Sequence, residues 1–248
     1  MKIRLVGPTY QQRSLPFDAQ RTINFWPVYD EQGKEVSALY GTPGLSLFST
    51  AGAQGHRQSF TSSNGRCFFV GGSTLYEILS DGTATDRGTL LSSVGNISMD
   101  ENATQLGICD GQRLYTLTYS NNSFAQVTDA DLPSGVGFLT VIDNYFVVNE
   151  TETGKFFISA LGDGTDWDAL DFATAESNPD ELRCVKNALG QLWLFGKNTT
   201  EIWTNTGASN FPFRRISGAI MEVGIIAPHS VQDVDNSIFW LGRDRMGG

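Results

Sequence analysis

The stretch YFVVNETETGKFFIS, residues 145–159, decides the fold class of this chain. Two runs of aromatic and β-branched residues flank a polar centre that ends in glycine. Such runs favour extended backbone, and a short polar segment with glycine between them favours a tight turn. Residues 145–159 therefore predict a β-hairpin.

The same layout of strand, small polar turn and strand recurs along the chain. The other copies are CFFVGGSTLYEI (67–78), QLGICDGQRLYTL (105–117), LWLFGKNTTEIWT (192–204) and IFWLGRDRMGG (238–248). Between the turn residues Gly72, Gly111, Glu152, Lys197 and Arg243 the spacings are 39, 41, 45 and 46 residues. A period of this size indicates a repeat architecture.

Each hairpin is flanked by a further short strand upstream and by a polar turn and strand downstream. Four strands in every repeat are typical of a β-propeller blade. The sequence thus predicts an all-β fold, a β-propeller with four recognisable blades and a partial fifth. A β-sandwich is the alternative, because its hairpins have similar turn spacing. Only the segment Asp168–Glu176 has a weak helical pattern.

The chain divides into an N-terminal extended segment, residues 1–55, and propeller blades over residues 56–248. The first leads into the propeller or completes it. The fifth repeat reaches its central turn at residues 242–248 and stops, so we expect a fragment of a longer protein. The strand edge at Ile238–Leu241 would need a cover. A C-terminal continuation could supply it, or a strand around Ile3–Val6 or Ile23–Val28.

Charge and hydropathy exclude several classes of protein. The chain has 17 basic and 27 acidic residues, a net charge of -10. This balance argues against the basic face that neutralises DNA phosphates, so we expect weak and non-specific DNA binding. No apolar run approaches the roughly 20 residues that span a bilayer. The first residues lack the apolar core of a signal peptide, which predicts synthesis in a cytoplasm.

Residues suited to catalysis or metal binding are few. Cys67, Cys109 and Cys184 have no paired spacing and lie in or beside apolar runs, so we expect buried free thiols. His56 and His229 stand near predicted strand starts, where surface or packing roles are expected. No nucleophile, metal or phosphate-loop motif occurs. We therefore expect no enzyme activity, no cofactor and no metal site.

The segment LGDGTDWDAL, residues 161–170, is similar to the Asp-box turn of sialidase-like propellers. Its spacing is compressed between Asp163 and Trp167, and no other blade repeats it. We interpret it as a β-turn whose tryptophan packs under the blade.

Four segments together resemble a known family. They are INFWPVYDEQGK…LYGTPGLSLF, DGTDWDALDFATAESNPDELRCV, LWLFGKNTTEIWTNTGASNFPFRRISGAIMEVG and SVQDVDNSIFWLGRDRMGG. The chain from about Asn24 to Gly248 is similar to the packaged-DNA stabilisation proteins of short-tailed bacteriophages, also called tail hub or nozzle proteins. The resemblance implies a β-propeller, a hexameric ring below the portal and adaptor, and a role in closing the DNA-filled head.

In such a protein Asn24–Pro27 would be an entry strand and Gly41–Gly44 a rigid turn leading into the first blade. The resemblance implies a virion protein of the tail, made in the host cytoplasm. Its partners would be further copies of itself, the head-to-tail adaptor and other tail proteins, with DNA passing during ejection. The alternative functions are a carbohydrate-recognising or carbohydrate-active propeller and a ligand-binding propeller.

Interfaces of a ring are rich in aromatic and arginine anchors. On this ground we predict interaction roles for Trp26, Trp203, Phe211, Phe213, Arg214 and Arg215. The alternative is that these side chains pack within their own subunit.

Overall fold

The computed structural model describes residues 23–29, 36–52, 55–175 and 180–244. The chain forms two compact units, Met1–Phe48 and Ser49–Gly248. In the first unit, strand β1 (Phe25–Tyr29) pairs antiparallel with β2 (Val36–Gly41). Trp26 lies opposite Tyr40 in this pair, and both side chains are exposed.

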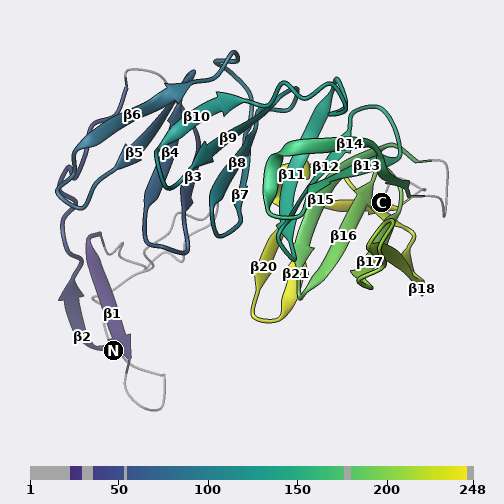
Figure 1. The fold of residues 1–248 in the computed structure, drawn as a ribbon. Helices are drawn as coiled ribbons and strands as arrows, with labels where there is room; N and C mark the ends of the chain where they lie inside the picture. The colour runs from purple at the N-terminus through teal and green to yellow at the C-terminus, as the bar shows by residue number, and fades with distance from the viewer. Residues whose placement is uncertain (1–22, 30–35, 53–54, 176–179, 245–248) are drawn as a thin grey trace. The chain divides into compact units, whose positions relative to one another are not determined.

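The second unit contains four antiparallel sheets of four strands each (Figure 1). Blade one consists of β3 (His56–Thr61), β4 (Cys67–Gly71), β5 (Thr74–Ile78) and β6 (Ala84–Thr89). Blade two consists of β7 (Ser98–Glu101), β8 (Gln105–Cys109), β9 (Leu114–Thr118) and β10 (Ser123–Gln126). Blade three consists of β11 (Val136–Ile142), β12 (Tyr145–Glu150), β13 (Lys155–Ala160) and β14 (Asp163–Thr174). Blade four consists of β15 (Leu182–Ala188), β16 (Gln191–Gly196), β17 (Thr200–Asn205) and β18 (Phe213–Met221).

In each sheet the spatial order of the strands follows the chain order. The hairpin that opened the sequence analysis is β12–β13, in which Val148 lies opposite Phe157. Each of the other three central hairpins also lies where the repeat predicts it, as β4–β5, β8–β9 and β16–β17. The predicted all-β fold and its four-strand repeat are thus confirmed. The weak helical pattern was misleading, because Asp168–Thr174 belongs to β14.

The end of the chain contains a short hairpin and a crossing strand. The hairpin joins β20 (Gln232–Val234) to β21 (Ser237–Phe239), as predicted for the start of a fifth blade. Before it lie β19 (Val223–Ile225) and a 3-10 turn, η1 (Pro228–Ser230). After it, β22 (Gly242–Asp244) pairs with β19. The sequence analysis placed residues 242–244 in a turn, and the structure corrects this.

Two glycines explain why β19 and β22 can form in so little space. A Cβ atom on Gly224 would lie 2.3 Å from the carbonyl carbon of Lys197, and one on Gly242 would lie 2.7 Å from Val223. Only glycine permits such close approach of the backbone. The pattern of alternating residues does not reveal these constraints, because Gly224 meets the turn between β16 and β17 of blade four and Gly242 meets its pairing partner β19.

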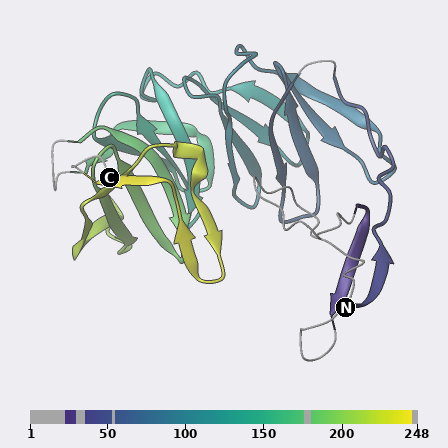
Figure 2. The same cartoon turned by 180° about the vertical axis from the view of Figure 1, so that it is seen from behind.

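The hydrophobic core consists of a series of layers between consecutive blades. Figure 2 shows the ribbon of these blades from behind. The first layer joins blades one and two through Phe68, Leu75, Leu106, Ile108 and Tyr115, among others. The next two layers join blades two and three, centred on Phe146, and blades three and four, centred on Phe156. A smaller layer, with Phe195 and Trp240, joins blade four to the final hairpin segment. Each fully buried side chain of this size contributes about 1.5–3 kcal/mol.

Candidate functional site

The first strands of blades two, three and four are tied to one another by side-chain hydrogen bonds. The amide of Leu139 on β11 donates to Ser98 Oγ on β7 at 3.0 Å, and the amide of Val141 donates to Asp100 Oδ2 at 2.7 Å. On the other flank of β11, Asn187 Nδ2 on β15 donates to the carbonyl of Val141 at 2.8 Å. These bonds hold three strands in register although the strands belong to three different sheets.

Thr140 stands at the centre of this arrangement and is fully buried. Its hydroxyl donates to Asp100 Oδ2 at 2.9 Å and accepts from the amide of Asn187 at 2.9 Å. Burial raises the pKa of Asp100, and the hydrogen bonds from Val141 and Thr140 oppose that shift. The Asp100 side chain therefore acts as a half-buried acceptor that links β7 to β11.

A buried ionic cluster supports blade one. Glu77 on β5 accepts two hydrogen bonds from Arg66, each of 2.7 Å, and one of 2.7 Å from Arg87 Nε. The hydrogen bond from Arg66 holds the pKa of Glu77 below its ordinary value, with Arg87 adding to this effect. A doubly bonded arginine–carboxylate pair is both strong and directional.

Arg66 also connects blade one to blade two. Its guanidinium carbon lies 5.3 Å from the ring centre of Tyr119, and its Nη2 donates to Asn122 Oδ1. Tyr119 in turn donates its hydroxyl proton to Glu101. Burial raises the pKa of Tyr119, so this hydroxyl remains a donor. The cluster is therefore a structural junction, with its charged groups satisfied inside the chain.

The segment that is similar to an Asp box forms the start of β14. Asp163 Oδ1 accepts from the amide of Thr165 at 2.9 Å, and Trp167 Nε1 donates to the carbonyl of Gly164 at 2.9 Å. Trp167 is buried against the layer between blades two and three, as predicted. Gln105 of blade two bonds both Asp163 and the Gly164 amide, so this turn also joins two blades.

Comparison with known proteins identifies the family. A family model described as "Bacteriophage P22 Gp10, beta-propeller" matches residues 1–248. The chain belongs to this family. It is therefore a bacteriophage structural protein with a β-propeller fold, which confirms the resemblance noted in the sequence.

No curated protein matches the chain. Among solved structures, the crystal structure of Hsv2 from Kluyvelomyces marxianus is similar, with a TM-score of 0.46 and 8% sequence identity. The similarity covers 74% of this chain and 58% of the Hsv2 chain, so the match spans less than two thirds of that protein.

The histidines of this phage protein pack against aromatic rings. His56 is exposed at the start of β3, with its ring centre 5.1 Å from that of Phe69. His229 in η1 lies 4.8 Å from the ring of Phe138, and burial lowers the pKa of His229. Neither contact involves an acidic partner or a nucleophile, so both fit the predicted packing role.

The cysteines follow the prediction in two cases out of three. Cys109 and Cys184 are buried free thiols, and burial raises the pKa of Cys109 to about 12. Cys67 is exposed, contrary to the prediction. In β4 the side chains of Phe68 and Val70 are buried, and Cys67 projects from the opposite side of the strand.

The described part of the chain contains an open pocket but no cluster of metal-binding side chains. An open pocket of about 280 Å³ is lined by Gly111, Gln112, Arg113, Ser134, Gly135 and Thr151. Among the described residues, no group of three or more His, Cys, Asp or Glu side chains could hold a metal ion. In the same residues, no helix is long and apolar enough to cross a membrane.

The six residues predicted to interact with partners occupy different environments. Trp26 on β1 is 68% exposed, whereas Trp203 and Phe213 are 9% and 3% exposed. These two pack with Phe211 around Phe156, in the layer between blades three and four. Their burial matches the packing alternative, because a partner could reach them only by displacing the core.

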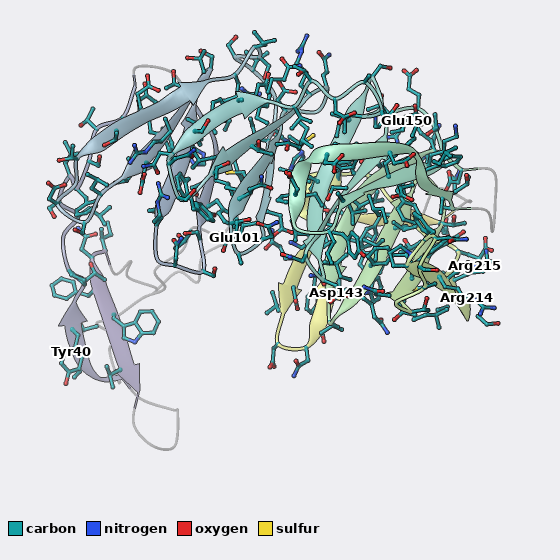
Figure 3. All side chains as sticks on the ribbon, in the orientation of Figure 1. Tyr40, Glu101, Asp143, Glu150, Arg214 and Arg215 are labelled. Carbon is teal, nitrogen blue, oxygen red and sulfur yellow. The ribbon has the colours of Figure 1, made fainter. Side chains whose placement is uncertain are left out.

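Arg214 and Arg215 are exposed on β18 (Figure 3). Arg215 Nη1 lies 3.7 Å from Glu201 Oε1, and Glu201 also accepts a hydrogen bond from Trp203 Nε1 at 2.9 Å. The interaction role predicted for the six residues, Trp26, Trp203, Phe211, Phe213, Arg214 and Arg215, stays a prediction.

The residues that tie the blades together were not identified from the sequence. Arg57, Arg66, Asp100 and Asn187 all lie in or beside strands, and each bonds a segment distant in the chain. The sequence does contain a signal for these residues, since charged or amide side chains interrupt the apolar alternation of these strands. This interruption indicates buried polar groups, but it does not identify their hydrogen-bond partners.

Proposed function

We propose that this chain forms a ring in the phage tail, the hub or nozzle that closes the DNA-filled head and conducts DNA during ejection. The family match over the whole chain carries this proposal. The ring would consist of copies of the chain, a hexamer by the resemblance. Its further partners would be the head-to-tail adaptor and other tail proteins, in a virion assembled in the host cytoplasm.

The structure supports a mechanical role for this ring. Consecutive blades share buried core layers, and side-chain hydrogen bonds cross from each blade to the next. Polar groups satisfied in this way make the blades resist relative movement. A protein that confines pressurised DNA needs this resistance, and it needs no reaction. We propose that the protein is not an enzyme and uses no cofactor.

The charge of the chain is consistent with DNA passing without being held. At a net charge of -10 the protein repels a polyanion. The release of counterions that drives binding to DNA needs lysine and arginine contacts to phosphates. Two of the arginines, Arg57 and Arg66, donate their guanidinium protons to groups within the chain.

The experiment is nuclease protection of packaged DNA in phage particles made with and without this gene. We expect heads lacking the protein to lose DNA to added nuclease, and protection to return when the purified protein is added. Negative-stain images of the restored particles should show added ring density at the tail vertex. Equal protection in both preparations would contradict the proposal. Turnover of host surface glycans by the purified protein would favour a carbohydrate-active propeller instead.

A further inference from the structure

The open pocket lies where two turns and one connection of neighbouring blades meet. Residues 111–113 belong to the turn between β8 and β9 of blade two, and Thr151 belongs to the turn between β12 and β13 of blade three. Ser134 and Gly135 end the connection between these two blades. The volume of about 280 Å³ lies below the roughly 300–1,000 Å³ of sites for drug-sized ligands. The pocket therefore suits a small chemical group.

The four side chains that line this pocket can all donate hydrogen bonds, and none of them is acidic. Arg113 contributes a guanidinium group, Gln112 an amide, and Ser134 and Thr151 each contribute a hydroxyl. Neither these hydroxyls nor Gln112 Nε2 forms a hydrogen bond with another described residue. In a chain with 27 acidic and 17 basic residues, such a group of donors without an acid favours an anionic ligand.

The guanidinium of Arg113 is not neutralised by the fold. Arg66 and Arg87 both donate to the carboxylate of Glu77. Arg113, by contrast, makes a single long contact, from Nη1 to Gln112 Oε1 at 3.4 Å, and it forms no ion pair within the part of the chain that the structure describes. Its remaining donors are therefore available to a carboxylate, which a guanidinium binds through two parallel hydrogen bonds.

The turn that carries Arg113 is fixed by a neighbouring carboxylate. Asp110 is buried, and its Oδ1 accepts from the amides of Gln112 at 3.1 Å and Arg113 at 2.7 Å. Its Oδ2 accepts from the hydroxyl of Tyr115 at 3.4 Å. Gly111 completes the turn with a φ of 84°, which a glycine adopts without strain. A site ordered in this way loses little conformational entropy when a ligand binds.

The opposite side of the pocket is held open by a glycine. A Cβ atom on Gly135 would lie 2.3 Å from Thr151 Oγ1, so a larger residue would fill the space beside this hydroxyl. The amide of Thr151 donates to the carbonyl of Gly135 at 2.9 Å, and the amide of Val136 donates to the carbonyl of Gln112 at 3.3 Å. These bonds join the two sides of the pocket across blades two and three.

The lining and its surroundings select the kind of anion. No aromatic or aliphatic side chain lines the pocket, so a sugar ring or another apolar ligand has no surface on which to pack. Asp129 and Asp131 lie on the connection between the two blades, and Glu150 (Figure 3) and Glu152 flank Thr151 in sequence. These acidic residues repel a doubly charged phosphate or a nucleic acid more than a single carboxylate.

We propose that this pocket binds the carboxylate of a glutamate or aspartate on a partner protein, with Arg113 as its ion-pair partner. The chemistry of the inference rests on the pocket, and the source of the carboxylate, a neighbouring protein of the tail, rests on the proposed function. Polar contacts of this kind lie at the rim of protein interfaces, where they fix register and orientation.

The first test is an NMR titration of the purified full chain with N-acetylglutamate N-methylamide and with the corresponding glutamine compound. We expect saturable shifts of the Gly135 and Thr151 amides and of the Arg113 Nε–H with the glutamate compound, and none with the glutamine compound. Arg113→Gln should weaken binding about tenfold, because hydrogen bonds to charged groups are the stronger ones.

Lys197→Gln is the matched control for the titration. Lys197 is exposed in the corresponding turn of blade four, outside the pocket, so loss of its charge should leave binding unchanged. Urea unfolding of Arg113→Gln should match the wild type, since its guanidinium makes only the 3.4 Å contact with Gln112. No saturable shift, or equal binding by Arg113→Gln and wild type, would overturn the inference.

Inorganic phosphate and glucuronate are the competing probes. Both should bind more weakly than the glutamate compound, and tighter binding of either would overturn the choice of a protein carboxylate. Phage particles restored with Arg113→Gln should retain less DNA under nuclease than particles restored with Lys197→Gln, and equal retention would overturn the tail partner. Binding of the glutamate compound by a wild-type protein that restores no protection would contradict the proposed function and leave the chemistry of the pocket standing.

Discussion

At the scale of single residues, a few buried or half-buried charged groups connect parts of the chain that are distant in sequence. Arg57 bonds the segment from Ser92 to Gly95, and Glu77 binds two arginines at once. An arginine suits these positions because its planar fork offers five donors in fixed directions. Each such residue therefore offers a specific test of the structure.

The first prediction concerns Arg57→Ala. Removal of the guanidinium should lower the free energy of unfolding by about 2 kcal/mol, since bonds from a charged donor are each worth more than neutral ones. Urea unfolding measures this loss, and hydrogen exchange of the Leu91 amide should become faster. Arg57→Lys should recover only part of the stability, because an ammonium group cannot reach five separated acceptor atoms. Full recovery of the free energy of unfolding by lysine would contradict the importance of the planar guanidinium group with its five donors.

The second prediction concerns Glu77→Gln. Two arginines lower the pKa of folded Glu77, so its carboxylate stabilises the fold above the ordinary glutamate pKa, and this contribution is lost as pH falls through the lowered value. At pH 7 the free energy of unfolding of the variant should be about 3 kcal/mol lower, because two half-buried arginines lose their carboxylate partner. Toward pH 3 the difference from wild type should shrink. A pH-independent difference in urea unfolding would show that charge is not the cause.

At the scale of elements, the contacts between outer strands depend on close approach. Gly88 on β6 packs against Phe124 on β10, and a Cβ on Gly88 would lie 2.2 Å from Phe124 Cδ1. Its φ of 149° also lies where side chains are strained. The absence of a side chain at this position thus lets blades one and two meet.

The third prediction is that Gly88→Ala destabilises the chain by about 2 kcal/mol through overpacking and backbone strain. Gly55→Ala is the control, because nothing lies within 4 Å of a Cβ placed there. Thermal unfolding compares the two. Combining Gly88→Ala with Phe124→Leu should restore part of the loss, and no recovery would indicate that backbone strain dominates.

The fourth prediction concerns the bonds between the first strands of the blades. Asn187→Ala removes the donor to the Val141 carbonyl and should cost about 1–2 kcal/mol, because the carbonyl is left without its partner. Asn205→Ala is a matched control, since Asn205 bonds the exposed turn residue Asp143 at 2.9 Å and should matter less. Equal losses in urea unfolding would contradict a special role for the β11–β15 contact.

At the scale of the whole molecule, stability comes from repeated layers between consecutive blades. The layers centred on Phe68, Phe146 and Phe156 each belong to two neighbouring blades. No blade buries its apolar face alone, which is the general condition for repeat architectures. The net negative charge also belongs to the whole chain and not to a single blade, since the excess of acidic residues is spread over its length.

The fifth prediction follows from that charge. At physiological salt the purified protein should bind duplex DNA more weakly than micromolar, since few phosphates could be neutralised. Fluorescence anisotropy with a labelled duplex measures this, and lowering the salt should strengthen binding only slightly. Micromolar affinity with a steep dependence on salt would contradict the prediction and reveal a basic surface in the assembled protein.

The amino-acid sequence by itself determined the strands, the turns and the four-strand repeat. Alternating apolar residues and turn residues such as Gly72, Gly111 and the pair Asp143–Asn144 act within a few positions of the chain, so they can be recognised locally. The family could also be recognised, because its characteristic segments are continuous in sequence.

Only the tertiary structure decided which side chains meet. It placed Trp203 and Phe213 in a core layer, left Cys67 exposed and brought Arg57 to residues 92–95. It also paired Asp100 with β11 across two sheets. The physical reason is that both faces of a propeller blade are covered. The alternation of residues shows which side chains share one face of a strand, but it does not show which residues pack against that face. Those neighbours depend on how one blade packs on the next, over separations of about 40 residues.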